Sequence, residues 1–320
     1  MEFTQEGGVM SEFDVLVVGG VGVDTIVRVP ELTIPLGDML GVPPVIDYVA
    51  HSGNGVALGF HGLGLRTQLI DYLGDDPQGA AVLARYAAFG LQFDHRPAPN
   101  GTPRSVNLVD AEGRRFSFFD GRHPDGLTYP AEFYRPHLER TRHVHVATDR
   151  ARTVFADAHE LGVTTSTDIH AWDGVSDYGR MLAEPADIVF LSAASVGDKI
   201  DELMRHIMDF GRAEVVVATE GAAGSRVLTR SDSEVRRFPA VRPERRVVDS
   251  NGAGDAYSTA FMSRWLDGRP VDECALAGAV SGAFACGAAG THEEIITADE
   301  LAAAVERARA SDRWQSVRLA

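Results

Sequence analysis

Short runs of apolar residues alternate along the chain with segments whose apolar positions recur at helical spacing. Asp14–Gly20 places four apolar residues in a row before a glycine pair, a pattern typical of a fully buried strand. Similar runs predict further strands, each near a segment that predicts a helix. The predicted strands are 67–72, 143–147, 163–168, 187–191 and 215–218, and the predicted helices are 53–64, 78–89, 131–140, 152–161 and 199–210.

This alternation predicts an α/β fold in which helices cover both faces of a mostly parallel sheet. Two β-rich segments interrupt it: 25–48 has short strand-like runs broken by prolines, and 104–119 predicts a hairpin around a turn at 110–113. Each is too short to fold alone, so we interpret them as one small β lid, whose exposed edge predicts a homodimer. The predicted domains are an α/β/α domain of residues 14–24, 49–100 and 121–312, a lid of 25–48 and 101–120, and a disordered N-terminal extension, 1–13.

Composition and charge narrow the possible functions. The 320 residues are 44% hydrophobic and 24% charged, which is enough apolar material for a large buried core. The formal net charge is −16 and the sequence has no cluster of Lys and Arg, which argues against a nucleic-acid partner. A phosphorylated small molecule remains compatible with this charge, because helix N-termini and backbone amides hold phosphate locally.

Other features favour a cytoplasmic protein. No apolar run approaches the roughly 18 residues of a membrane span, so we expect no membrane partner. Residues 1–13 carry acidic side chains where a signal peptide needs a basic start and an apolar core. Cys274 and Cys286 would lie about 18 Å apart on one helix, too far for a disulfide. A reducing cytoplasm fits these observations.

The segment 247–266 carries the clearest candidate chemistry. Gly252 and Gly254 let the backbone turn sharply into a helical pattern and leave the first amides of that helix uncovered. Such N–H groups, together with the helix dipole, form a site for an anion whose charge grows during a reaction. Asp255 lies in the first helical turn beside this site, where it can take a proton from an attacking hydroxyl group. The residues alone also allow an ordinary glycine-rich turn in which Asp255 only improves the helix dipole.

Residues 249–255 resemble a known motif. They read Asp-Ser-Asn-Gly-Ala-Gly-Asp, similar to the Asp-Thr-x-Gly-Ala-Gly-Asp motif of the ribokinase-like PfkB carbohydrate kinases, with Ser250 in the Thr position. With four further segments the resemblance covers residues 14–291. It implies a three-layer α/β/α sandwich with a small β lid, ATP and Mg²⁺ as cofactors, and transfer of the γ-phosphoryl group to a primary alcohol of a sugar or sugar-like acceptor.

The resemblance also implies catalytic roles for this segment. Asp255 would be the general base, and the amides of residues 253–255 would form the anion hole. Gly252, Ala253 and Gly254 would shape that hole at the start of the helix.

Two segments resemble the acceptor side of the family. Asp24 follows the first strand as the family's substrate-binding Asp does, and a carboxylate there can bind two sugar hydroxyls. Gly53 and Asn54 lie in a segment that resembles the family's Gly-Gly loop, which approaches the sugar before a helix. Ser52 replaces the first Gly, and Ala57 stands where the family has a substrate-contacting Asn. The resemblance therefore assigns acceptor binding to Asp24, Gly53, Asn54 and Asp255, and it does not identify the sugar.

Two other segments resemble the nucleotide side. A loop after the predicted strand 215–218 resembles the family's Thr-x-Gly-x-x-Gly nucleotide loop. Residues 274–289 resemble the helix beside its adenine pocket, where small residues permit close packing against the nucleotide or the Asp255 helix. The residues assigned to ATP by this resemblance are Thr219, Gly221, Gly224, Asn251 and Gly254.

The metal site departs from the family pattern. After the strand 187–191 the family carries Asn-x-x-Glu, which organises Mg²⁺ and its waters, whereas residues 192–195 here are Ser-Ala-Ala-Ser. Mg²⁺ keeps several waters and needs few protein ligands, so we still expect it beside ATP, with no ligand assigned. Asp168 and His170 lie at the end of the predicted strand 163–168, at the edge of the sheet where ligands bind. Potassium is a further candidate cation.

Two other functions stay open. A nucleoside kinase of the same superfamily would use the same base and anion hole, and Phe116, Phe118 and Phe119 could stack a nucleobase. A sugar- or nucleotide-binding homologue without turnover is suggested by the missing Asn-x-x-Glu and by Ala57. A dinucleotide-binding oxidoreductase and a P-loop enzyme are excluded, because residues 19–22 lack Gly-x-Gly-x-x-Gly spacing and no Gly-x-x-x-x-Gly-Lys run is present.

Overall fold

The structure, a computed structural model, describes residues 11–33, 37–111, 115–232, 234–310, 314 and 317–318. Residues 1–10 of the predicted N-terminal extension and part of the turn predicted at 110–113 lie outside this described part. The strands are β1 (Phe13–Val18), β2 (Gly22–Arg28), β3 (Ile46–Ala50), β4 (Thr67–Leu73), β5 (Gln92–Pro97), β6 (Arg104–Val109), β7 (Arg115–Asp120), β8 (Thr141–Val146), β9 (Thr164–Asp168), β10 (Ile188–Ser192), β11 (Val215–Thr219), β12 (Ser225–Thr229), β13 (Arg236–Phe238) and β14 (Val317–Arg318).

One large sheet forms the centre of the molecule. Its strand order within the described residues is β14-β13-β12-β11-β10-β9-β8-β1-β4-β5. Neighbouring strands from β11 to β5 are parallel, whereas β12, β13 and β14 extend the other edge in antiparallel fashion. Residues 15–18 of β1 are fully buried, as expected for a strand covered on both faces. The prediction of a mostly parallel central sheet is confirmed.

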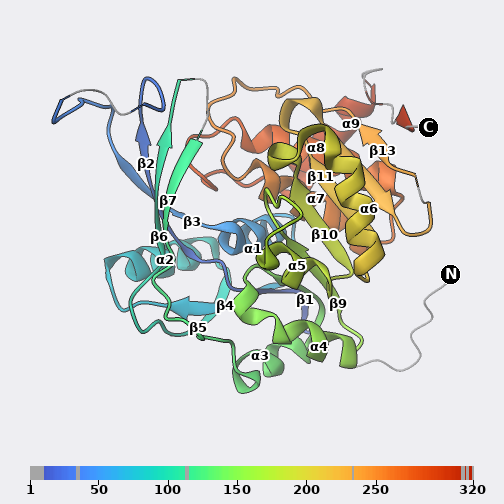
Figure 1. Ribbon diagram of the computed structural model, residues 1–320, viewed down its shortest axis with the longest axis horizontal. Helices are drawn as coiled ribbons and strands as arrows, with labels where there is room; N and C mark the ends of the chain where they lie inside the picture. The colour runs from blue at the N-terminus through green and yellow to red at the C-terminus, as the bar shows by residue number, and fades with distance from the viewer. Residues whose placement is uncertain are drawn as a thin grey trace.

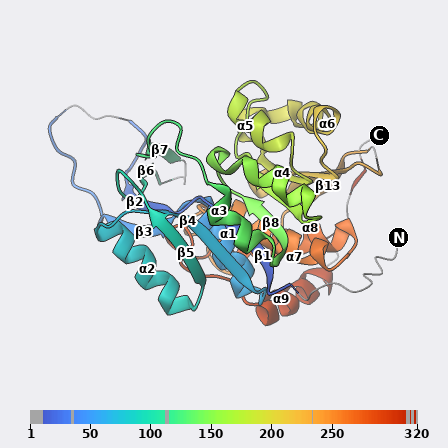
Figure 2. The same ribbon diagram turned by 90° about the horizontal axis from the view of Figure 1, so that it is seen from below.

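Helices cover both faces of this sheet (Figures 1 and 2). α3, α4, α5 and α6 pack on one face, and α1, α2, α7 and α8 pack on the other, where α9 lies against α7 and α8. The helices are α1 (Ser52–Gly62), α2 (Pro77–Phe89), α3 (Ala131–Leu138), α4 (Thr153–Glu160), α5 (Asp177–Ala183), α6 (Ile200–Phe210), α7 (Ala253–Leu266), α8 (Val271–Ala285) and α9 (Ala298–Ala310).

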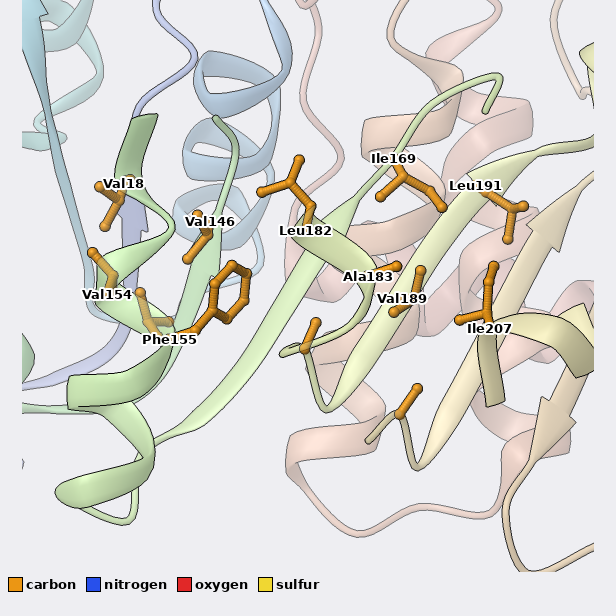
Figure 3. Close-up of a cluster of buried hydrophobic side chains, with 14 of the residues drawn as sticks. Val18, Val146, Val154, Phe155, Ile169, Leu182, Ala183, Val189, Leu191 and Ile207 are labelled. Atoms are coloured by element: carbon orange, nitrogen blue, oxygen red, sulfur yellow. The ribbon is translucent and has the colours of Figure 1, made fainter. Parts of the chain in front are cut away.

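The apolar residues that predicted the strands form the core between these layers. Figure 3 shows the layer under α4, α5 and α6, where Val146 and Val189 of the sheet lie among Phe155, Leu182 and Ile207 of the helices. Burying a side chain of this size stabilises the fold by about 1.5–3 kcal/mol. The packing fixes the strands, and with them the loops that leave their carboxyl ends.

A second, four-stranded sheet projects from one side of the molecule (Figure 1). Its order is β3-β2-β6-β7, and we call it the small sheet. β6 and β7 pair in antiparallel fashion, as the predicted hairpin requires, and β2 joins the two segments by pairing with β3 and β6. Because β2 begins at Gly22, Asp24 lies inside a strand of the small sheet rather than in a loop before it.

Some elements were not predicted. β5 is an edge strand with mostly exposed side chains, so polar residues interrupt the apolar run that marks the inner strands. β12 is a buried strand that includes Arg226, which pairs with two carboxylates. Because it contains a charged residue, β12 does not read as an apolar run. The helix predicted at 274–289 ends at Ala285, and the chain beyond it turns through Gly290, whose φ of 98° does not fit a helix.

The carboxyl ends of the parallel strands define one edge of the main sheet, where ligands bind in open α/β sheets. The Gly19–Gly20 pair follows β1 at this edge, and Asp168 ends β9 there. Asp255, in the first turn of α7, is close enough to Asp168 to interact with it electrostatically. The helix start predicted to carry the chemistry therefore lies over this edge.

Candidate active site

The glycines at the start of α7 shape its first turn. Gly252 precedes the helix with a φ of 75°, a left-handed conformation that glycine adopts without strain. A Cβ atom on Gly252 would overlap the carbonyl oxygen of Thr291, so the close approach of these two segments also requires glycine. Gly254 faces open space, with no atom beyond the adjoining backbone within 4 Å of the position of a Cβ. A ligand can therefore approach this turn.

Two amides of this turn are free to bind an anion. The amide of Ala253 donates a long hydrogen bond, 3.3 Å, to the carbonyl oxygen of Ser250. The amides of Gly254 and Asp255 have no hydrogen-bond partner within the described residues. Unpaired N–H groups at a helix start bind phosphate oxygens, and the helix dipole adds to the attraction. The predicted anion hole is thus most accessible at the amides of Gly254 and Asp255.

The carboxylate of Asp255 is held on one side only. Its Oδ2 atom lies 2.9 Å from Nε2 of His292, and Nδ1 of that ring lies 3.0 Å from the amide nitrogen of Asn54. The side chain of Asp255 keeps 15% of its surface exposed, whereas that of His292 keeps 4%. Oδ1 of Asp255 has no hydrogen-bond partner within the described part of the chain. One oxygen is fixed and the other remains available for a ligand.

Asp24 is the centre of a second polar cluster, on the small sheet. Its Oδ2 atom accepts hydrogen bonds from Asn107 at 2.9 Å and from Thr291 at 3.4 Å, and its Oδ1 atom lies 3.4 Å from His51 Nε2. Burial opposes ionisation, but hydrogen bonds from His51, Ser105 and Asn107 together hold the pKa of Asp24 below its ordinary value. Asp24 is therefore a charged acceptor at neutral pH, suited to bind hydroxyl groups.

A short segment after α8 joins the two clusters. Thr291 reaches Asp24, and His292 reaches Asp255. Arg85 of α2 anchors this segment, because it donates to the carbonyl oxygen of His292 and, at 3.1 Å, to Glu293. The base and the acceptor-binding residue predicted from the sequence are therefore linked through residues 291–293.

The start of α1 is the third component of the site. Gly53 packs backbone to backbone against the loop after β1: a Cβ atom there would overlap the carbonyl oxygen of Gly19. His51, which precedes the helix, has a φ of 72°, rare for a residue other than glycine, and its ring points to Asp24. Asn54 is completely buried and contacts His292. Gly53 and Asn54 therefore support the site, with Asn54 next to the residue that holds Asp255.

The loop after β11 lies beside the other flank of α7. Gly221 has a φ of 56° and faces open space, whereas a Cβ atom on Gly224 would overlap the carbonyl oxygen of Phe238. Ser225, which follows the loop, hydrogen-bonds the hydroxyl group of Tyr257 on α7 at 2.8 Å. Gly278 of α8 packs against the ring of Tyr257, so the small residues of α8 serve the contact with the Asp255 helix.

Two arginines of the small sheet reach the motif before α7. Arg28 of β2 donates to Asp249 Oδ2 at 2.7 Å, and Arg115 of β7 donates to Asn251 Oδ1 at 2.7 Å. Asp249 in turn accepts the amide of Asn251 at 3.0 Å. The small sheet thus contacts the chain directly before the predicted anion hole, and the guanidinium of Arg28 lies against a buried carboxylate there.

The site combines free amides at a helix start, a carboxylate with one oxygen bound and one open, and a buried polar cluster. A comparison with known families identifies the family of the chain. A model described as "pfkB family carbohydrate kinase" matches residues 49–298. The chain belongs to the pfkB family of carbohydrate kinases. It is therefore a phosphotransferase that acts on hydroxyl groups.

Individual members of the family show different degrees of similarity. The acarbose 7(IV)-phosphotransferase of Actinoplanes sp. strain SE50/110 is 48% identical over 280 residues, which cover 87% of this chain and 93% of the relative. The structure of a microbiome-derived acarbose kinase has a TM-score of 0.85 and 45% identity, covering 92% of this chain and 99% of that one. The ATP-dependent ribose-1-phosphate kinase of Halopiger xanaduensis is 27% identical, over 79% of this chain and 84% of its own.

In this carbohydrate kinase the predicted site residues fall into two groups. Asp24, Asn54 and Asp255 are linked through residues 291–292 by the contacts given above. Thr219, Gly221 and Gly224 form a separate loop, whose connection to α7 runs through Ser225 and Tyr257. No helix in the described parts of the chain is long and apolar enough to cross a membrane.

In place of the family's Asn-x-x-Glu, two serines form hydrogen bonds with the backbone. Ser192 accepts the amide of Ala194 at 3.3 Å, and Ser195 donates to the carbonyl oxygen of Ala171 at 2.6 Å. Within the described residues no group of three or more His, Cys, Asp or Glu side chains could hold a metal ion. Asp168 is the nearby carboxylate: burial, then repulsion from Asp255, raises its pKa, although the amide of His170 hydrogen-bonds it at 2.7 Å. A cation beside these two carboxylates would relieve their repulsion, so the residues present fit a largely hydrated Mg²⁺.

His51 and His292 are the functional candidates that sequence reasoning missed. Both are single histidines in loops, and neither belongs to the motifs that carried the resemblance. For His292 the one available signal was the polar run Thr-His-Glu-Glu directly after an alanine-rich segment. Only the tertiary contacts with Asp24 and Asp255 distinguish these rings from ordinary loop residues.

Proposed function

We propose that this enzyme transfers the γ-phosphoryl group of ATP to a primary hydroxyl group of a sugar-like acceptor, with Asp255 as the general base. The observation that carries the proposal is the first turn of α7. There, within the described residues, Oδ1 of Asp255 is unpaired beside the unpaired amides of Gly254 and Asp255, and Gly254 faces open space. A base and an anion hole are then adjacent, as in-line phosphoryl transfer requires.

The proposed reaction moves one proton and one phosphoryl group. The acceptor O–H bond breaks as its proton passes to Asp255 Oδ1, and the oxygen forms a bond to the γ-phosphorus. The bond from that phosphorus to the oxygen bridging to the β-phosphate breaks, and ADP leaves with the electron pair. The amides of Gly254 and Asp255 stabilise the charge that grows on the transferring group.

The acceptor contacts we propose are Asp24, Asn54 and Phe119. Asn54 Oδ1 is buried without a hydrogen-bond partner in the described residues, and Asp24 Oδ1 has only His51 at 3.4 Å. Ser105 pairs with both Asp24 and Phe119 across the small sheet, so these side chains share one face. Phe119 is 70% exposed beside His51, with ring centroids 5.6 Å apart. Hydroxyl acceptors next to an exposed aromatic ring suit a sugar ring, and the relative named for acarbose supports acceptors of that class.

A nucleoside kinase is the second candidate, because Phe119 can stack a nucleobase equally well. Phe116 and Phe118 support it less, since their pairing with Leu108 and Val106 puts them on the opposite face of the small sheet from Asp24. A binding protein without turnover is disfavoured by the open Oδ1 atom of Asp255 beside the free amides.

An acceptor screen tests the proposal. ADP release by the purified chain with MgATP is measured in the presence of acarbose, glucose, ribose or adenosine. We expect turnover with acarbose or a simple sugar, and a thermal shift for the same compound with an ATP analogue, since a ligand at about 100 times its Kd stabilises the fold by about 2.7 kcal/mol. Turnover with adenosine alone would favour the nucleoside kinase, and binding without any ADP release would contradict catalysis.

For ATP we propose Thr219, Gly221, Gly224, Asn251 and Gly254. The open conformation of Gly221 and the free amide of Gly254 support this assignment. Mg²⁺, when bound, neutralises charge between the β- and γ-phosphates. We propose Asp168 as the carboxylate that would hold it through water, because Asp168 is partly buried and lies close enough to Asp255 for the two carboxylates to repel each other.

Replacing Asp168 with asparagine tests the metal assignment. We expect the Mg²⁺ concentration needed for half-maximal ADP release to rise about 10-fold, the effect typical of an outer-shell metal ligand. Asp173→Asn is the matched control, because Asp173 caps the same loop with hydrogen bonds to the amides of Val175 and Ser176. An unchanged Mg²⁺ requirement in the Asp168 variant would remove this residue from the metal site.

We further propose a homodimer formed through the small sheet. β7 is an edge strand whose side chains are all exposed, and Phe116 and Phe118 are 54% and 57% exposed on the outer face. Open edges and apolar faces of this kind favour association. Multi-angle light scattering should find a dimer that a double variant, F116S with F118S, converts to a monomer, whereas L161S, directly after α4, leaves it intact. A monomeric unmodified chain would contradict the proposal.

We also propose a cytoplasmic location for this enzyme. Cys274 is buried and Cys286 half-buried, and both are free thiols. Free cysteines persist in reducing compartments, where ATP is also abundant.

A further inference from the structure

We infer that His292 is a positioning residue for Asp255, which it holds oriented for proton transfer. The inference rests on the phosphoryl transfer proposed above. Its basis is a chain of three side chains from three separate elements: Asn54 of α1, His292 after α8, and Asp255 of α7.

The hydrogen-bond network assigns the proton of the imidazole. The side-chain nitrogen of Asn54 donates to the carbonyl oxygen of Val49 at 3.2 Å, so this NH₂ group, rather than the amide oxygen, faces Nδ1 of His292 at 3.0 Å. Nδ1 must then accept, which leaves the ring proton on Nε2, 2.9 Å from Asp255 Oδ2. An imidazolium would bring N–H donors together at Nδ1, so this contact selects the neutral ring with its proton directed at the base.

Packing fixes the ring in this orientation. A Cβ atom on Gly55 would overlap Nε2 of His292, and one on Gly252 would lie 2.8 Å from the same atom. Arg85 fixes the backbone through the carbonyl oxygen of His292. Glycine on both sides leaves room for an imidazole between the starts of α1 and α7, and the enclosed ring retains little freedom to rotate.

The other ionisable groups near Asp255 do not supply such a donor. His145 of β8 interacts with Asp255 electrostatically, but burial lowers its pKa to about 4, and its Nε2 atom has no hydrogen-bond partner in the described residues. Asp168 repels the carboxylate of Asp255. Within the described part of the chain, His292 is therefore the side chain that donates a hydrogen bond to this carboxylate.

The expected consequence concerns the geometry of the base. The hydrogen bond from Nε2 fixes Oδ2, so that Oδ1 is the oxygen presented to the acceptor hydroxyl. When the proton reaches Oδ1, the bond from Nε2 to Oδ2 can persist, and His292 itself gains and loses no proton.

Two substitutions separate this role from simple filling of space. H292L keeps most of the volume without a donor, whereas H292Q places an amide N–H near the position of Nε2. With the acceptor that the native enzyme turns over, we expect H292L to lower kcat about 10- to 100-fold, the effect of losing a hydrogen bond to a charged group. H292Q should recover most of the rate, because its amide restores a donor to Oδ2, and the KM for ATP should stay unchanged in both variants.

H61Q is the matched control, because Nε2 of His61 also makes a hydrogen bond, to the carbonyl oxygen of Phe89, at the far end of α1 from the site. Melting temperatures identify any variant that fails to fold. ¹⁵N chemical shifts of the native histidines provide a readout that needs no acceptor: we expect His292 to be neutral with its proton on Nε2. A proton on Nδ1 would overturn the inference, whatever the variants do.

The kinetic outcomes distinguish this inference from the proposed function. A folded H292L enzyme with native kcat would overturn the role of His292, while inactivity of an Asp255→Asn enzyme would leave the proposed function standing. Turnover by the Asp255→Asn enzyme would instead remove the base itself.

Discussion

Replacing Asp255 with asparagine will lower kcat by about 10² to 10⁴-fold, the usual contribution of a general base. The amide cannot take the proton of the acceptor hydroxyl, although it fills nearly the same volume at the start of α7. The backbone amides of Gly254 and residue 255 remain, so nucleotide affinity should stay close to native. ADP release at saturating acceptor, with binding of an ATP analogue measured separately by calorimetry, checks both expectations.

Asp267→Asn is the control for this experiment, since Asp267 caps the other end of the same helix. It should keep native turnover. Turnover near the native rate in the Asp255 variant would contradict the assignment of the base, and a large loss of nucleotide affinity would mean that Asp255 has a binding role instead.

Asp24→Ala should raise the KM for the acceptor about 10- to 100-fold, because hydrogen bonds to a charged group are lost on one side of the site. The substitution also leaves His51, Asn107 and Thr291 without their shared partner, so Asp24→Asn is the milder companion variant. In both variants the effect on kcat should be smaller than the effect on KM, since Asp255 and the free amides are untouched. Initial rates over a range of acceptor concentrations separate the two parameters.

A neighbouring carboxylate on the same sheet gives the comparison. Asp47 of β3 accepts a hydrogen bond from Thr25 and lies on the face opposite Asp24, so Asp47→Ala should leave the acceptor KM unchanged. If the Asp24 variants also show a native KM, Asp24 does not bind the acceptor.

The chemistry of the first turn of α7 was readable from the sequence, and its surroundings were not. Gly252, Gly254 and Asp255 are neighbours along the chain, so their spacing alone predicts a turn, free amides and a carboxylate. His292 reaches Asp255 from 37 positions away, and Thr291 reaches Asp24 from 267 positions away. Contacts of this kind depend on the packing of α1, α7 and the segment after α8, and no local pattern encodes them.

The same distinction holds for the fold. β1, β10 and β11 were predicted because they are covered on both faces and therefore read as apolar runs. β5 lies at an edge, where polar residues are tolerated, and β12 buries an arginine whose carboxylate partners are supplied by other elements. α8 ends early and is followed by Gly290, whose left-handed conformation is visible only in the folded chain.

The most direct test is a structure of the enzyme with its acceptor, ADP and a planar phosphoryl mimic such as aluminium fluoride. We predict that Asp255 Oδ1 lies about 2.6–3.2 Å from the acceptor oxygen. The amides of Gly254 and Asp255 should lie about 2.7–3.1 Å from the mimic. A mimic bound away from these amides, or an acceptor oxygen facing a side chain other than Asp255, would contradict the account.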